Sequence, residues 1–168
     1  MLQFIPMRYS KGLILYRDDP DTGLALRLIS TLVPDSLLIL SYVLFSSGER
    51  QGGIVLLAET IIFSLILLAV YPRSYEVYED HVQIALGPPF NFKVKIWFDN
   101  IKSIEVTSRL IFSVNFATRM TGKYVSIIPK NGMAIAITPK DSEAFVESAN
   151  QALGEWLKSR QDSSRRVQ

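Results

Sequence analysis

Cysteine is absent from the 168-residue chain, and histidine occurs once, as His81. Without cysteine the chain can form no disulfide, no thiolate metal site and no cysteine nucleophile. A single histidine excludes a metal site built from several histidines. We therefore expect the protein to hold neither a metal nor another cofactor.

Signatures of common enzyme families are missing as well. The sequence contains no G-x-S-x-G, Walker loop, G-x-G-x-x-G or H-E-x-x-H motif. The formal net charge is only +2, which gives none of the positive excess of a nucleic-acid-binding protein. These absences predict a protein that is not an enzyme, has no small-molecule substrate and does not bind nucleic acid.

Long apolar runs are what the sequence has in place of such motifs. Residues 54–71 read IVLLAETIIFSLILLAVY and carry one charge, Glu59. As a helix this run is roughly 27 Å long, close to the hydrocarbon thickness of a bilayer. It lacks the polar face of a soluble helix, and Tyr71, Pro72 and Arg73 follow as an aromatic anchor, a helix stop and a cation. The run predicts a membrane span.

A weaker candidate span lies before residues 54–71 in the sequence. Residues 28–46 are mostly apolar but hold Pro34 and Asp35 near their middle, where proline kinks a helix and a carboxylate is costly. The short turn SSGERQGG separates this run from residues 54–71. We therefore expect a transmembrane helical hairpin over residues 28–72, and a buried soluble helix is the alternative reading of 28–46.

Lysine and arginine counts predict the orientation. The segment 1–27 has four such residues, the hairpin turn has only Arg50, and the remaining 13 follow the second span. Because positive residues stay inside, both termini should be cytoplasmic and the turn should face out. This predicts a two-span protein of the plasma membrane with an N-terminal cytoplasmic segment over 1–27.

Residues 73–158 read as a mainly β domain. Short alternating runs bounded by turn residues recur at even spacing, which favours a sandwich or barrel. We expect seven strands, at 74–80, 81–86, 92–97, 100–108, 110–117, 123–129 and 133–139. KGLILY at 11–16 is either a further short strand or an interfacial anchor.

One helix should close the domain. Pro139 is expected at the first helical position, with Asp141 in the first turn. Phe145, Ala149 and Trp156 then belong to one apolar stripe, suited to covering an open end of a small barrel. The polar residues 159–168 predict a disordered tail.

Three segments, YEVYEDHVQI, DNIKSIEV and ITPKDSEAF, together with the preceding hairpin, resemble prokaryotic membrane proteins that carry a bacterial pleckstrin-homology-like (PH-like) domain. The resemblance covers residues 28–158. It implies a seven-stranded bent sandwich capped by one C-terminal helix, with a role in scaffolding or partner binding at the membrane, and it implies no catalysis. In eukaryotic relatives of this fold a basic loop between the first two strands holds a phosphoinositide. Here that turn is Glu79-Asp80-His81, which would repel an anionic headgroup.

Two sets of residues are candidates for a functional site. Asp35 and Glu59 lie inside the apolar runs, where acids often mark ion or proton pathways, although each could instead be protonated or face a partner helix. The irregular stretch 107–123 mixes cations with apolar side chains, as a membrane-surface or partner contact does. Its candidate residues are Arg109, Phe112, Phe116, Arg119 and Lys123. The alternative is a strand whose phenylalanines face the core.

These observations favour a membrane-anchored interaction or scaffold module whose partners are the lipid bilayer and either another protein or a second copy of the chain. The first alternative is a small subunit of a transport or export complex that uses Asp35 and Glu59. The second is a sensor of anionic lipid surfaces.

Overall fold

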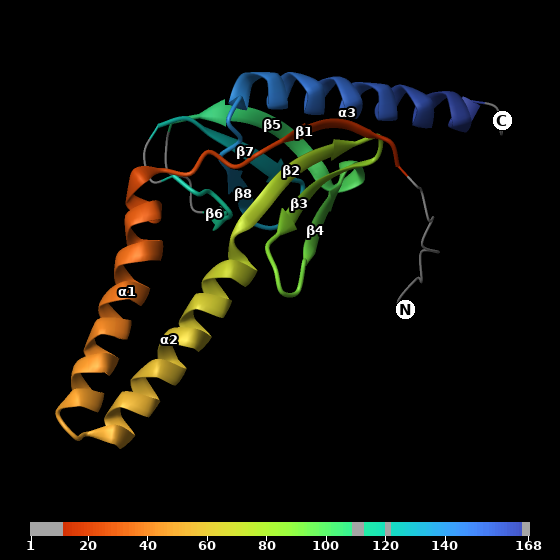
Figure 1. Ribbon diagram of the computed structural model, residues 1–168. Coiled ribbons are helices and arrows are strands. Elements are labelled where there is room, and N and C mark those ends of the chain that lie inside the picture. Colours follow the sequence, from red (N-terminus) through yellow and green to blue (C-terminus); the bar gives the residue numbers. More distant parts are fainter. Residues whose placement is uncertain (1–11, 109–112, 120–121, 166–168) are drawn as a thin grey trace.

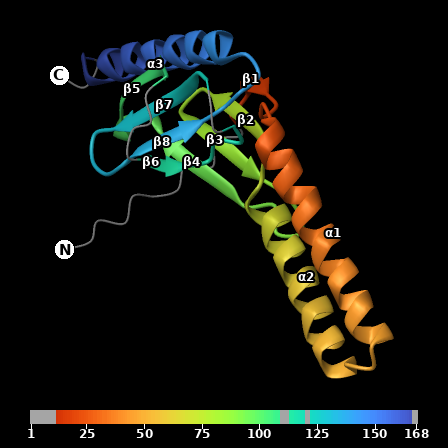
Figure 2. The ribbon, with the colours of Figure 1, turned by 90° about the vertical axis from the view of Figure 1, so that its left-hand side faces the viewer.

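The computed structural model describes residues 12–108, 113–119 and 122–165. A helical hairpin extends from one end of a β domain, and a third helix lies across the opposite side of that domain (Figure 1). The view turned by 90° shows the same separation between the hairpin and the third helix (Figure 2).

The hairpin consists of α1 (Leu24–Ser46) and α2 (Arg50–Val70). Both helices are long and apolar enough to cross a membrane, with mean hydropathies of 1.9 and 2.6 over their most apolar windows. Only 6% and 11% of those windows are buried inside the protein. A core helix of a soluble domain would be mostly covered, whereas these two helices are largely uncovered by the rest of the chain.

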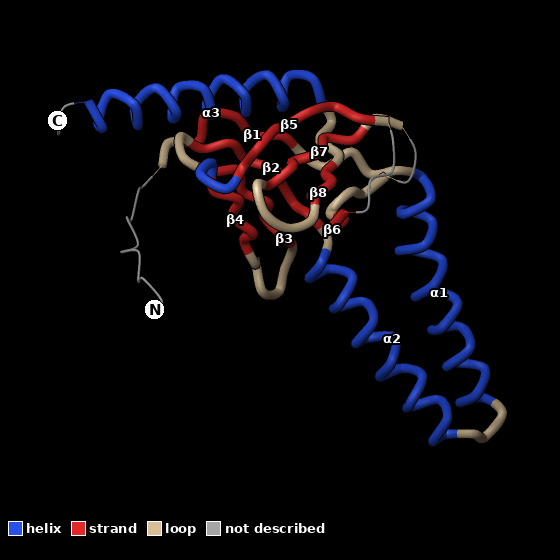
Figure 3. Tube along the Cα trace, turned by 180° about the vertical axis from the view of Figure 1, so that it is seen from behind, coloured by secondary structure: helices blue, strands red, loops and turns tan. Residues whose placement is uncertain are grey.

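Small residues hold the two helices together near the turn. The Ser41 hydroxyl donates a hydrogen bond of 2.8 Å to the carbonyl of Gly53, and both residues are buried. A Cβ at Gly53 would lie 3.0 Å from the Phe45 ring, so glycine allows the close approach. Figures 1 and 3 show that the helices lie closest at this end and separate toward the β domain.

The first sheet joins both ends of the hairpin. Its strands are β1 (Ile14–Asp18), β2 (Pro72–Tyr78), β3 (His81–Leu86) and β4 (Lys93–Trp97), antiparallel in the order β1-β2-β3-β4. β1 directly precedes the hairpin and β2 directly follows it, yet Asp18 pairs with Tyr75 in the same ladder. Both flanks of the hairpin are therefore fixed in one sheet.

The second sheet faces the first across the core. It contains β5 (Ile101–Thr107), β6 (Ser113–Asn115), β7 (Tyr124–Pro129) and β8 (Ala134–Ile137), in the order β5-β7-β8-β6. Only the β6–β8 pair in it is parallel. A 3-10 turn, Phe98–Asn100, joins the two sheets. The seven predicted strands are all present, although β6 ends at Asn115 rather than at 117 and residues 110–112 of that prediction lie outside the described residues; β1 is an eighth strand that the sequence left undecided.

Helix α3 (Ser142–Arg165) covers the core, as predicted for the capping helix. Phe145 is fully buried and packs edge-on against Tyr16 of β1 and Tyr75 of β2, with ring centroids 6.0 and 6.4 Å apart. Ala149 and Ala152 continue the buried stripe.

The two ends of α3 differ from the prediction. The helix begins after Asp141, whose carboxylate accepts the Ala144 N–H at 3.0 Å as an N-cap, whereas Pro139 precedes the helix and bridges to Pro20. At the other end residues 159–165 are helical, although we expected a disordered tail. The Arg160 guanidinium lies 4.9 Å from the Trp156 ring, a contact that composition alone does not reveal.

A buried carboxylate in the first sheet makes stability depend on pH. Burial opposes the charge of Glu76, but hydrogen bonds from Ser74, Tyr78 and Gln83, with the charge of Arg17, outweigh it and lower the pKa of Glu76 below its ordinary value of 4.5. The charged form thus stabilises the fold above about pH 4.5, and this stabilisation is lost as pH falls through the lower folded pKa.

We expect Glu76→Gln to lower the free energy of unfolding at pH 7 by about 1–2 kcal/mol, because an amide nitrogen cannot accept these hydrogen bonds. The variant should also lose part of the stability change between pH 5 and pH 3, measured by urea unfolding at each pH. Glu105→Gln, at an exposed position of β5, is the control and should leave both the free energy of unfolding at pH 7 and its pH dependence unchanged. An unaltered pH profile in Glu76→Gln would contradict this assignment.

Candidate functional site

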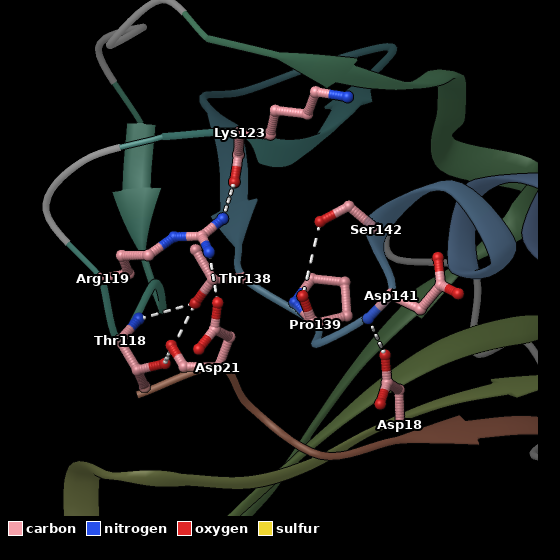
Figure 4. Close-up of polar contacts among 9 residues, drawn as sticks. All are labelled: Asp18, Asp21, Thr118, Arg119, Lys123, Thr138, Pro139, Asp141 and Ser142. Atoms are coloured by element: carbon pink, nitrogen blue, oxygen red, sulfur yellow. Dashed lines mark hydrogen bonds and ion pairs between the residues drawn. The ribbon is translucent and has the colours of Figure 1, made fainter. Parts of the chain in front are cut away.

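Three loops meet where the hairpin joins the β domain, and we call this meeting point the junction. They are residues 19–23 before α1, the described residues 116–119 and 122–123 between β6 and β7, and residues 138–141 before α3 (Figure 4). Thr118 is buried at their centre, where its hydroxyl donates to the Asp21 carbonyl at 2.7 Å and its N–H donates to the Thr138 hydroxyl at 2.9 Å. The Asp21 N–H donates to the Thr138 carbonyl at 2.7 Å. These bonds attach the start of α1 to both neighbouring loops.

Ion pairs surround this hydrogen-bonded centre. Arg119 pairs with Asp21 and also donates to the Lys123 carbonyl at 2.6 Å. Lys123 pairs with Glu143 at 2.7 Å, a hydrogen bond that raises the pKa of the lysine. The junction borders a hollow of about 350 Å³, and its cations are already matched by acids. The cluster is therefore suited to holding α1 in place rather than to binding an anion.

Hydrogen bonds also attach the end of α2 to the start of α1 and to the β domain. The hydroxyls of Thr22, before α1, and Tyr71, after α2, share a hydrogen bond of 2.5 Å. The Tyr71 carbonyl accepts the N–H of Gly87 in the β3–β4 turn at 2.8 Å. Both helix ends are thus connected to the domain through backbone and side-chain contacts.

A groove runs beside the C-terminal half of α3. This half of α3 lies on the side of the domain away from the hairpin (Figure 1). Its volume is about 590 Å³, and its walls come from α3, the β2–β3 turn and the end of β4. Both tryptophans of the chain, Trp97 and Trp156, line it. Its charged lining residues are Glu79, Asp80, Asp99, Glu155 and Arg160. Four acids against one base make the groove negative.

The groove combines aromatic rings with an excess of negative charge, a composition typical of a surface that binds an oppositely charged peptide segment. The described residues offer no comparable chemistry for a metal. In the described parts of the chain, no three histidine, aspartate or glutamate side chains gather in a way that could hold a metal ion.

Residues 73–151 match the family model of the bacterial PH domain. The chain carries a bacterial PH domain. Neither the curated proteins nor the solved structures searched gave a match to this sequence. The predicted PH-like domain is therefore confirmed, and it runs from the start of β2 into α3. β1 lies outside the matched residues but belongs to the domain's first sheet. PH domains are generally binding modules rather than catalysts.

The turn that holds phosphoinositides in eukaryotic relatives is closed in this PH domain. His81 is buried, stacks on Tyr78 with ring centroids 4.5 Å apart, and bonds through Nδ1 to the Asp80 carboxylate at 2.5 Å. Glu79 and Asp80 make up the turn itself. No cationic side chain of β2 or β3 accompanies them beyond Arg73 at the far end of β2.

The residues predicted for surface contact fall into three groups. Arg119 and Lys123 belong to the junction and are occupied by ion pairs. Phe116 is partly buried against the core, and its carbonyl accepts the Tyr75 hydroxyl at 2.7 Å. Burial at this place raises the pKa of Tyr75 to about 12. Arg109 and Phe112 lie outside the described residues.

The two acids of the hairpin point out of it. Asp35 in α1 and Glu59 in α2 are both exposed, and neither has a hydrogen-bond or ion-pair partner within the described part of the chain. The structure does not bring them together into a carboxylate pair. Each carboxyl is therefore available to a neighbour outside this chain.

Sequence reasoning did not identify the residues that form the groove or the junction. Their residues come from segments far apart in the sequence. The hydrophobic periodicity within one segment carries no information about tertiary contacts between segments. The one usable signal was the scarcity of tryptophan, because both copies line the same groove.

Proposed function

We propose that the protein is a membrane-anchored interaction module, in which α1 and α2 span the plasma membrane and the PH domain binds a partner at the cytoplasmic face. The observation that carries this proposal is the first sheet of the PH domain, which takes strands from both sides of two membrane-length helices. Such an arrangement holds a binding module against a bilayer.

The membrane location is supported by the apolar surface of the hairpin. The side chains of both helices are largely uncovered, and burying this surface in lipid removes it from water. Pairing of β1 with β2 requires both flanks of the hairpin to lie on one side of the bilayer. The excess of lysine and arginine in those flanks over the turn supports the cytoplasm as that side.

The groove along α3 supports partner binding. It lies on the side of the PH domain opposite the hairpin, so a bilayer around α1 and α2 leaves it open. Its negative charge and its two tryptophans suit a basic segment with apolar side chains, because the partner's cations gain from the acids and its apolar side chains pack beside the rings. We propose such a protein segment as its occupant.

Charge reversal in the groove tests this proposal. We expect Glu79→Lys with Glu155→Lys to abolish the heteromeric crosslinks that the wild-type chain forms in intact membranes, read by mass spectrometry. The matched control is Glu147→Lys, which places the same charge on an exposed position of α3 outside the groove. If the crosslinks persist in the double variant, the groove is not the partner-binding site. If the wild-type chain forms no crosslink at all, the protein is not an interaction module.

A transport or export subunit remains the second candidate, favoured by the outward orientation of Asp35 and Glu59. Acids at such positions bind a second membrane helix or line a pathway shared with one. Asp35→Asn with Glu59→Gln is the added arm of the same crosslinking experiment. Loss of partners in this variant, but not in the groove variant, would assign the contact to the membrane rather than to the PH domain.

A further inference from the structure

The turn between β3 and β4, residues 87–92, carries two exposed aromatic side chains. Phe90 is 64% exposed and Phe92 is 58% exposed. Their rings stack on each other with centroids 5.4 Å apart and form one continuous apolar tip. Neighbouring large rings in water mark a contact surface for a partner or a membrane.

The tip has a fixed position relative to α2. Gly87 at its base is buried and donates its N–H to the Tyr71 carbonyl at 2.8 Å. A Cβ at Gly87 would lie 2.2 Å from the Leu68 carbonyl oxygen, so the base of the turn rests on the backbone of the last helical turn. Figures 1 and 3 show the β3–β4 turn extending from the domain on the same side as the hairpin, beside the adjoining end of α2.

Two cations lie on the strands beside this turn. Arg73 follows the end of α2 and Lys93 follows Phe92, and both are exposed without an ion-pair partner in the described part of the chain. Aromatic rings at the boundary of the acyl chains, with cations at the level of the phosphates, are the pattern of an interfacial membrane anchor.

We propose that this turn is a second membrane contact, in which Phe90 and Phe92 enter the interfacial layer of the bilayer that holds α2, while Arg73 and Lys93 meet anionic headgroups. The inference rests on the proposed location of α2 in that bilayer. The contact differs from the closed β2–β3 turn, and it directs the α3 groove away from the lipid. The PH domain is then held in one orientation relative to the bilayer.

The absence of cysteine allows a direct test by single-site labelling. The full chain is reconstituted in vesicles of phosphatidylcholine with phosphatidylglycerol and labelled with an environment-sensitive fluorophore at Phe90→Cys, Leu65→Cys or Gln161→Cys. Leu65 is an exposed residue of α2, and Gln161 is exposed on α3 at the opposite side of the domain. Lipids carrying a quencher then report contact with the bilayer.

We expect a blue shift and lipid quenching at positions 65 and 90, and neither at 161. Quenching at 65 without quenching at 90 would overturn this inference alone, whereas no quenching at 65 would refute the membrane location of α2. A blue shift at 90 without lipid quenching would show that protein covers the turn, which also overturns the proposal. Lys93→Glu should reduce quenching at 90 in these vesicles but not in pure phosphatidylcholine, and Lys158→Glu on α3 is the matched control. Equal quenching at 90 in the Lys93 and Lys158 variants would remove the headgroup contact.

Discussion

Ile62→Lys together with Leu65→Lys should release the protein from the membrane fraction. Both residues lie near the middle of α2 and are exposed on its surface. Replacing an apolar side chain by lysine at the centre of a span costs about 3–4 kcal/mol on insertion scales, so the pair costs about 6–8 kcal/mol. The measurement is the share of full-length chain that remains in the pellet after alkaline carbonate treatment and ultracentrifugation.

The same pair separates a lipid-facing helix from a soluble one. On a helix surrounded by water, lysine at two exposed positions would be harmless, because nothing covers those positions in the chain itself. Ile62→Ala with Leu65→Ala keeps the run apolar and is the control that should stay in the pellet. Retention of the lysine pair, or release of the wild-type chain by carbonate, would contradict the membrane location.

Phe145→Ala should produce the second large effect, a loss of about 3–5 kcal/mol in the free energy of unfolding of the PH domain. The ring is fully buried and contacts Tyr16 and Tyr75, so its removal leaves a cavity where α3 meets β1 and β2. Urea unfolding of the full chain in detergent, followed by near-ultraviolet circular dichroism, measures the change.

Leu157→Ala is the matched control on the same helix. Leu157 is 46% exposed and lies outside the core cluster, so its truncation should change stability by about 0.5 kcal/mol or less. If the two variants lost similar stability, α3 would not cap the core through Phe145 as described.

Local patterns carried the prediction of the fold. The 54–71 run identified its helix because every face is apolar, and the alternation in 81–86 and 92–97 identified β3 and β4. β1 stayed ambiguous because ILYRD shows no clear alternation, and its pairing with β2 depends on a contact across the whole hairpin. The start of α3 was misplaced because both Pro139 and Asp141 are favoured at helix starts, and only the bond from Ala144 to the Asp141 carboxylate decides between them.

The candidate sites were harder to predict for a related reason. Arg119 and Lys123 have the composition of a surface-binding stretch, but their charges are taken up by Asp21 and Glu143, which lie far away in the sequence. The exposure of Phe90 and Phe92 depends on the base of their turn, where Gly87 rests on α2. The residue types along one segment show which charged and aromatic side chains are present. Tertiary contacts decide which of these side chains are paired within the chain and which remain exposed to a partner.

The placement of β1 ahead of the hairpin has a consequence for how the chain matures. The ribosome releases β1 before the two helices and β2 after them, so the first sheet cannot close until the hairpin has been made. Folding of the hairpin brings Asp18 and Tyr75 together and so reduces the entropy of closing the long loop between them. On the proposed membrane location of α1 and α2, completion of the domain is thereby linked to helix integration, and a chain whose helices fail to integrate would leave β1 and the edge of β2 unpaired and exposed to aggregation.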